Sequence, residues 1–202
     1  MNSLTPNPFW RLFIALPVPP AVKQEVLRTQ AELRRGLGSG EIRWTAAEQF
    51  HVTLRFLGNV DPVRVESLIA ALQSVCAEAA PFRLQVGQVG FFPPGQRPRV
   101  VWVGLHESEG RLAAFQTAVA RVVQDYAEKA EDHPFSGHLT LGRIKNLPST
   151  EARALTQRAQ ALSQRVLGEW TADHLELIRS ELRPQGSHYT GVATLPFLKS
   201  EI

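Results

Sequence analysis

Cysteine is almost absent from this sequence of 202 residues, with Cys76 as the single example. One cysteine excludes an intrachain disulfide and a zinc site made of several thiolates. The chain also lacks an apolar run near the ~18 residues that a membrane span requires, and the short apolar segment 12–20 is interrupted by prolines. We therefore expect a protein of the reducing cytoplasm, in which Cys76 is a buried structural thiol.

An excess of charge of one sign is lacking as well. Lys and Arg total 22 and Asp and Glu total 19, which gives a net charge of +3. This weak balance permits an anionic ligand without demanding one. There is also no glycine-rich phosphate loop and no dinucleotide-binding fingerprint, so these two common routes to nucleotide binding are excluded.

Composition and apolar periodicity predict a globular α+β chain with mixed or antiparallel sheets. Residues 1–8 hold two prolines and are expected to be flexible, and residues 9–202 are expected to form one domain or two closely packed lobes. Strands are predicted at residues 10–16, 42–44, 51–57, 82–88, 99–105, 138–144, 171–181 and 187–196. Helices are predicted at residues 21–37, 62–80, 109–129 and 149–166, with a turn at 58–59 and a proline-rich loop at 91–98.

One short pattern occurs twice, first as His51-Val52-Thr53-Leu54 and again, 87 residues later (51 to 138), as His138-Leu139-Thr140-Leu141. Side chains alternate between the faces of a strand, so each histidine points the same way as the threonine two residues on. The same alternation puts Arg55 on the face of His51 and Thr53. If the two strands lie next to each other, two imidazoles and two hydroxyls surround one pocket.

These four groups suit a phosphodiester. Imidazole titrates near neutral pH, so one ring can accept a proton while the other donates one. The hydroxyls can donate hydrogen bonds to phosphate oxygens. A nearby cation would stabilise charge in the transition state, and Arg143 is the nearest candidate in sequence. Its odd offset from His138 places it on the opposite face of a regular strand, so a bulge, twist or strand end is needed to aim it at the pocket.

A metal site is the competing interpretation of the histidine pair. Zinc takes three or four protein ligands, and neither histidine has a carboxylate or cysteine at ligand spacing. His133 lies in an Asp-His-Pro loop and is a weak third ligand. No metal is therefore expected, and the remaining histidines, His106, His133, His174 and His188, are interpreted as surface or structural residues.

The duplicated motif resembles the 2H phosphoesterase family, and within it the bacterial and archaeal RNA 2′,3′-cyclic phosphodiesterases, also called 2′-5′ RNA ligases. The likeness covers nearly the whole chain. It is carried by the two motif blocks and by the segments 11–19, 43–44, 81–82, 87–93, 98–102, 180–182 and 186–189. One departure is Gly137, where the family often has a proline before the second histidine; glycine loosens the approach to the strand but leaves the chemical groups in place.

The resemblance implies a bilobal fold of two pseudo-symmetric lobes, each a mixed or antiparallel sheet with outer helices, around a central cleft. It implies that His51 is the proton donor to the leaving ribose oxygen and that His138 is the proton acceptor that activates water. Thr53 and Thr140 would hold phosphate oxygens with help from Arg143. No metal and no nucleotide cofactor is implied. The product would be a 2′-phosphate, and reversal with a 5′-hydroxyl would form a 2′–5′ bond.

An RNA substrate would need phosphate contacts and base contacts beyond the motif. The candidate phosphate contacts are Arg43, Arg55, Arg97 and Arg99, each otherwise a solvated surface charge. The candidate stacking residues are Trp44, Phe50, Phe92 and Tyr189, each otherwise part of the core. Two other functions stay open, which are hydrolysis of small cyclic phosphates with the same four residues and RNA binding without catalysis. A monomer with no obligatory protein partner and no membrane contact is expected.

Overall fold

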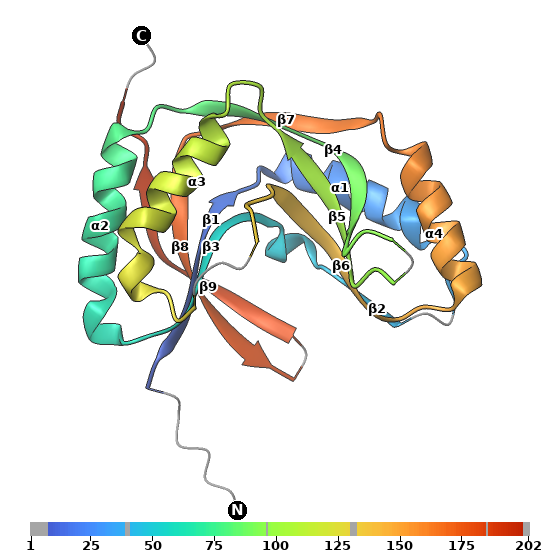
Figure 1. The fold of residues 1–202 in the computed structure, drawn as a ribbon, viewed down its shortest axis with the longest axis horizontal. Helices are drawn as coiled ribbons and strands as arrows, with labels where there is room; N and C mark the ends of the chain where they lie inside the picture. The colour runs from blue at the N-terminus through green and yellow to red at the C-terminus, as the bar shows by residue number, and fades with distance from the viewer. Residues whose placement is uncertain (1–7, 39–40, 96, 130–132, 185, 200–202) are drawn as a thin grey trace, which may run out of the picture.

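The computed structural model describes residues 8–38, 41–95, 97–129, 133–184 and 186–199. Within them, the strands form two antiparallel sheets (Figure 1). The four-stranded sheet has the order β3 (His51–Val60), β1 (Trp10–Pro17), β8 (His174–Arg183) and β9 (Gly186–Pro196). The five-stranded sheet has the order β2 (Glu41–Trp44), β6 (His138–Asn146), β5 (Val100–His106), β4 (Phe82–Phe92) and β7 (Val166–Ala172). The predicted flexible N-terminus lies outside the described residues except for Pro8.

Four longer helices pack in two pairs, one pair on each sheet. α2 (Val65–Glu78) and α3 (Arg111–Val122) contact each other and the four-stranded sheet, whereas α1 (Pro20–Arg34) and α4 (Ser149–Ala161) contact each other and the five-stranded sheet. Figure 1 shows the two helix pairs at opposite ends of the molecule. The prediction of a bilobal α+β fold with outer helices is confirmed.

The first strand, β1, contributes residues to both hydrophobic clusters of the described chain. Its apolar run is buried on both faces, as expected for a strand covered on two sides. Leu12, Ile14 and Leu16 join the large core beneath the helices. Phe13 and Ala15 point to the other face and pack with Ile178 in a smaller cluster beside Tyr189. One face of β1 therefore packs in the large core beneath the helices, and its other face packs in the smaller cluster beside Tyr189.

Several element boundaries differ from the sequence prediction. The strand predicted at 171–181 is two strands, β7 and β8, which break at Asp173. β3 continues through the predicted turn at 58–59, because Gly58 pairs with Leu12 in the sheet. The helix predicted at 109–129 ends at Val122 and is followed by the short 3₁₀ helix Gln124–Tyr126.

Two of the helices begin in different ways. The Asp61 side chain accepts a hydrogen bond from the Val63 amide and caps the 3₁₀ turn Pro62–Arg64, which leads into α2. α4 begins at Ser149, and Pro148 occupies its capping position without a side-chain hydrogen bond.

Both His-x-Thr strands contain a β-bulge one residue after the threonine. The pairing of β3 with β1 skips Leu54, and the pairing of β6 with β5 skips Leu141. An extra residue on one strand reverses the alternation of its side chains beyond that point. The side chain five residues after each histidine therefore returns to the histidine's own face, and this places Phe56 and Arg143 at equivalent positions.

The bulge corrects the prediction for Arg55. That residue was expected on the face of His51 and Thr53, but it lies on the buried face and is only 6% exposed. Its Nη2 atom donates a hydrogen bond to the carbonyl oxygen of Lys129 at 3.1 Å. Arg55 is therefore a structural cation under the sheet, and its prediction as a phosphate contact is wrong.

The central position of β1 gives a stability prediction. Replacing Ile14 with Ala leaves a cavity in a fully buried site and is expected to lower the free energy of unfolding by roughly 2–5 kcal/mol. The matched control is Val63→Ala, because Val63 is 83% exposed and its truncation should change stability by no more than about 0.5 kcal/mol. Urea unfolding of the two variants measures the difference, and equal effects would contradict the assigned core.

Candidate active site

A single cleft of about 480 Å³ gathers most of the residues that the sequence pointed to. The residues that line it are Arg11, Leu12, Phe13, Arg43, Trp44, Thr45, Gln49, His51, Thr53, Phe56, His138, Thr140, Arg143, Ser180, Leu182, Ser187 and Tyr189. Among these described lining residues there are three arginines and two histidines, and there is no Asp or Glu. A concave site that is rich in cations and free of carboxylates favours an anionic ligand.

The two motifs meet in this cleft, although they come from different sheets. β3 forms an edge of the four-stranded sheet, β6 lies within the five-stranded sheet, and the two strands contact each other. His51 and Thr53 line the cleft from β3, and His138 and Thr140 line it from β6. The structure thus brings together the two imidazoles and two hydroxyls that the repeat placed on separate strands.

Each imidazole is held by the backbone carbonyl two residues before it. Nδ1 of His138 lies 2.7 Å from the carbonyl oxygen of Ser136, and the ring of His51 makes an equivalent hydrogen bond to the backbone of Gln49. A carbonyl can only accept, so Nδ1 of His138 carries the hydrogen. Its Nε2 atom therefore has a free lone pair when the ring is neutral, as a proton acceptor requires.

Aromatic rings shield both histidines from water. Phe13 and Tyr189 lie 4.7 and 5.4 Å from the ring of His51, measured between centroids. Phe92 lies 5.1 Å from the ring of His138. These rings account for much of the burial that disfavours the charged imidazolium.

Burial lowers the pKa of both histidines. The pKa of His51 falls from 6.5 to about 4, chiefly through desolvation, with smaller contributions from the charges of Lys23 and His138, while the hydrogen bond to Gln49 raises it. The pKa of His138 is lowered by burial and by the neighbouring Arg143 guanidinium, against a raising effect of the bond to Ser136. Both rings are therefore predominantly neutral at pH 7 in the free protein, and a bound anion would favour protonation.

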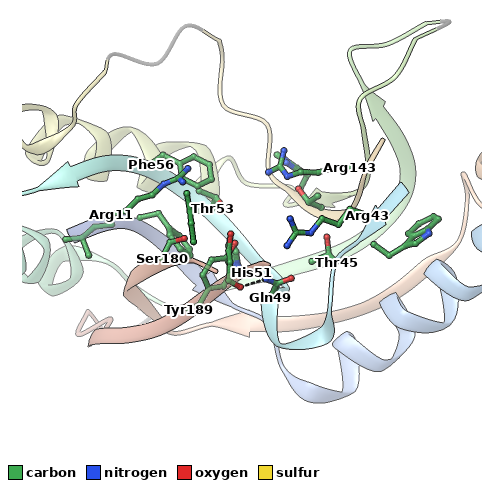
Figure 2. A pocket seen from close by; sticks show the side chains of 17 residues that line it. Arg11, Arg43, Thr45, Gln49, His51, Thr53, Phe56, Arg143, Ser180 and Tyr189 are labelled. Atoms are coloured by element: carbon green, nitrogen blue, oxygen red, sulfur yellow. Dashed lines mark hydrogen bonds between the residues drawn. The ribbon is translucent and has the colours of Figure 1, made fainter. Parts of the chain in front are cut away.

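Arg43 and Arg143 form the most basic part of the cleft. They are direct partners in the antiparallel pairing of β2 with β6, and Figure 2 shows both side chains on the same side of the pocket. Like charges at directly opposed positions of a sheet are destabilising. A negative ligand between or above them relieves that repulsion, so the pairing favours a phosphate at this place.

The predicted base contacts are only partly in the cleft. Tyr189 lines it and stands edge-on to His51, and Trp44 lines it from the end of β2. Phe50 is 2% exposed and belongs to the main core. Its prediction as a substrate contact is therefore corrected, because the ring has no surface on which a base could stack.

Several cleft residues were missed by sequence reasoning. Arg11, Gln49 and Ser180 line the pocket from β1, the turn before β3, and β8. Phe56, which is 58% exposed, faces the cleft across from Arg143 (Figure 2). Arg11 and Phe13 share a face of the first strand, but only the pairing of β1 with β3 and β8 shows that this face is the cleft. Arg97 and Arg99 are not among the described residues that line it.

The glycine before the second motif fits tightly. A Cβ atom at Gly137 would lie 3.0 Å from Leu112 Cδ2 and 3.4 Å from two side-chain atoms of Leu105. The carbonyl oxygen of Gly137 accepts a hydrogen bond of 3.0 Å from the Leu105 amide. The approach to the strand is therefore held by β5, and the expectation that glycine loosens it is not met.

The described part of the chain offers neither a metal site nor a membrane-spanning helix. Within those residues, no group of three or more His, Cys, Asp or Glu side chains is placed to hold a metal ion. No helix among them is long and apolar enough to cross a membrane.

The presence of two equivalent motifs in one cleft agrees with the match of this chain to a known family. The model of the LigT-like phosphoesterase family matches this chain twice, over residues 16–102 and 103–189. Each match contains one His-x-Thr motif. The chain therefore belongs to the LigT-like 2H phosphoesterases and is an enzyme, as its resemblance predicted.

Curated relatives share this assignment. A protein of Methanocaldococcus jannaschii is 26% identical over 186 residues, covering 89% of this chain and 96% of the relative. A protein of Aeropyrum pernix is 36% identical over 146 residues, covering 70% of this chain and 78% of the relative. Both of these relatives are named RNA 2′,3′-cyclic phosphodiesterase.

Solved structures show the same fold. The crystal structure of TT0787 from Thermus thermophilus superposes with a TM-score of 0.75 at 27% identity, covering 93% of this chain and 98% of that protein. The structure of E. coli LigT in complex with 3′-AMP gives a TM-score of 0.72 at 20% identity, with 95% and 99% covered. At that identity the second likeness concerns the fold alone.

The lowered pKa of His51 predicts a loss of stability in acid. The unfolded chain binds a proton near pH 6.5 and the folded protein only near pH 4, so stability is complete above pH 6.5 and falls as the pH drops through this window. Between pH 7.5 and pH 5, this histidine should cost the folded protein about 2 kcal/mol. Between the same two pH values, the free energy of unfolding of His51→Asn should fall by about 2 kcal/mol less than that of the wild type. Urea unfolding at both pH values measures this difference. The exposed His106 gives the control, His106→Asn, and equal acid sensitivity of both variants would refute the assignment.

Proposed function

We propose that this protein hydrolyses the 2′,3′-cyclic phosphate at the end of an RNA to a 2′-phosphate by acid–base catalysis with two histidines. The convergence of His51, Thr53, His138 and Thr140 in one cleft supports this proposal most directly. The names of the curated relatives supply the substrate class. The reaction needs no metal, because the two imidazoles supply both proton transfers.

The roles follow from the chemistry of each group. Water attacks phosphorus while Nε2 of His138 takes its proton, and the bond from phosphorus to the ribose 3′ oxygen breaks while His51 donates a proton to that oxygen. The hydroxyls of Thr53 and Thr140 donate hydrogen bonds to the non-bridging oxygens. His138 ends protonated and His51 neutral, so exchange with solvent restores the starting state.

The anionic substrate itself prepares the acid. In the free enzyme both rings resist protonation, because burial lowers their pKa values. A bound phosphate brings a negative charge next to them, which favours an imidazolium. Repulsion between His51 and His138 keeps the second ring neutral, so one acid and one base are present together. Arg143 and Arg43 stabilise the charge that grows on the phosphate oxygens.

The same catalytic groups would also join RNA ends. If the 5′-hydroxyl of a second RNA replaces water, it attacks the cyclic phosphate, the 3′ oxygen leaves, and a 2′–5′ bond forms between the two RNAs. Tyr189, which lies beside His51 and lines the cleft, would contact the terminal nucleoside. Both motifs come from one chain, so a monomer holds the complete set of catalytic groups.

The first test is hydrolysis of an RNA oligonucleotide that ends in a 2′,3′-cyclic phosphate, with chelator present. His51→Ala and His138→Ala should each lower kcat by about 100-fold or more, because each removes one of the two proton transfers. His106→Ala, at an exposed histidine outside the cleft, should keep the wild-type rate. Near-normal turnover by either cleft variant would overturn the roles, and turnover only of mononucleotide cyclic phosphates would reassign the substrate.

The pH dependence of kcat/KM tests the electrostatics separately. The free enzyme must hold one protonated and one neutral imidazole, and both pKa values lie below 6.5. We therefore expect a bell-shaped profile with its maximum below pH 6.5 and a fall that approaches tenfold per pH unit above it. An alkaline limb beginning above pH 7.5 would contradict the burial of the pair.

A further inference from the structure

The backbone carbonyl group at each of the two bulges accepts a hydrogen bond from the side chain of a buried glutamine. Side chains that are both polar and buried are few among the described residues, namely Thr29, Gln30, Arg55 and Gln116. Both glutamines in this set donate to the extra residue of a His-x-Thr strand. An extra residue interrupts the ladder, and a buried carbonyl needs a donor from elsewhere.

Gln30 serves the bulge in β6. It lies on α1, is 5% exposed, and donates from Nε2 to the carbonyl oxygens of Leu141 and Thr45, both at 2.9 Å. The Thr45 amide also donates to the Leu141 oxygen at 2.9 Å. The bulge carbonyl is therefore fixed from the helix and from the strand end together. Arg143 is the side chain that this bulge turns into the cleft.

Gln116 serves the bulge in β3 in the same manner. It lies on α3, is also 5% exposed, and donates from Nε2 to the carbonyl oxygen of Leu54 at 3.2 Å. Phe56 is the side chain that this bulge turns into the cleft. The two contacts are reciprocal, since the helix from the first family match holds the motif of the second, and the helix from the second holds the motif of the first.

We propose that Gln30 and Gln116 are positioning residues that fix the two bulges and thereby aim Arg143 and Phe56 at the substrate. Loss of the donor leaves a buried carbonyl without one of its partners, which disfavours the bulged geometry. The alternative is a regular ladder, in which a shift of one residue turns each later side chain to the other face. The Arg143 side chain would then point away from the cleft and would no longer contact the phosphate of the substrate. The proposal rests on the proposed function for its activity measurement.

A double-mutant cycle tests the pair Gln30 and Arg143. Gln30→Met keeps the length of the side chain without its amide, and should lower kcat/KM on the cyclic-phosphate RNA by about tenfold, the equivalent of 1.4 kcal/mol. Arg143→Ala should lower it by roughly 100-fold. In the Arg143→Ala background, Gln30→Met should change kcat/KM by less than about twofold, because the side chain that it aims is gone.

The matched controls separate positioning from stability. Thr29→Val removes a buried hydroxyl that bonds only within α1, to the Glu25 carbonyl oxygen, and should leave kcat/KM unchanged. Gln116→Met should couple to Phe56→Ala and be additive with Arg143→Ala. Thermal unfolding of each variant shows the loss of stability, which should be the same for Gln30→Met in both backgrounds.

The outcomes are decisive in either direction. Additive effects of Gln30→Met and Arg143→Ala, or wild-type kcat/KM in a folded Gln30→Met protein, would overturn the proposal. If Gln30→Met does not fold, Gln30→Asn, whose amide is one methylene too short to reach the two carbonyls, provides the second variant, with the same coupling expected. If the wild type does not cleave the RNA, the proposed function fails, and the cycle is then measured on the affinity for inorganic phosphate, where absence of coupling would overturn the positioning role by itself.

Discussion

The alternation of side chains along a strand constrains every group in this cleft. A regular strand presents only every second residue to one face, and this suffices for a histidine and a threonine but not for the cation five residues after the histidine. One inserted residue in β6 turns Arg143 into the cleft. The equivalent insertion in β3 sends Arg55 into the interior and brings Phe56 out, so the two bulges decide which side chain follows each motif on the cleft face.

The electrostatics of the cleft follow from what surrounds the two imidazoles. Burial among aromatic rings lowers the pKa of both histidines, and the hydrogen bonds to the carbonyls of Gln49 and Ser136 oppose that effect without cancelling it. Two arginines lie at opposed positions of neighbouring strands, and the described residues that line the cleft include no carboxylate. This balance of charge favours an anionic ligand in the cleft.

The sequence predicted the part of the site that depends on local spacing. His51, Thr53, His138 and Thr140 follow from a repeat and from strand periodicity alone, and the odd offset of Arg143 indicated that a bulge was needed. Arg55 was misplaced because the bulge in β3 leaves no mark in the local pattern. Phe50 was misassigned because the local sequence around an aromatic residue next to the motif strand is the same whether its ring lies in the core or in a cleft.

The residues that were missed depend on long-range pairing. Arg11 and Ser180 reach the cleft only because β1 and β8 are neighbours in one sheet, and no local signal in one sequence reports that pairing. The break between β7 and β8 was missed for a related reason, since the two strands belong to different sheets but are separated in the chain by Asp173 alone.

The place of β1 in its sheet has a consequence for how the chain is made. β1 lies between β3 and β8, and β8 is synthesised about 160 residues after it, between residues 10–17 and 174–183. During translation the first strand therefore has one open edge, which can pair with another chain. β8 closes this edge and brings Ser180 to the cleft, and β9, which pairs with β8, brings Tyr189. A nascent chain thus lacks both the partner of its first strand and one side of its cleft until β8 and β9 have left the ribosome.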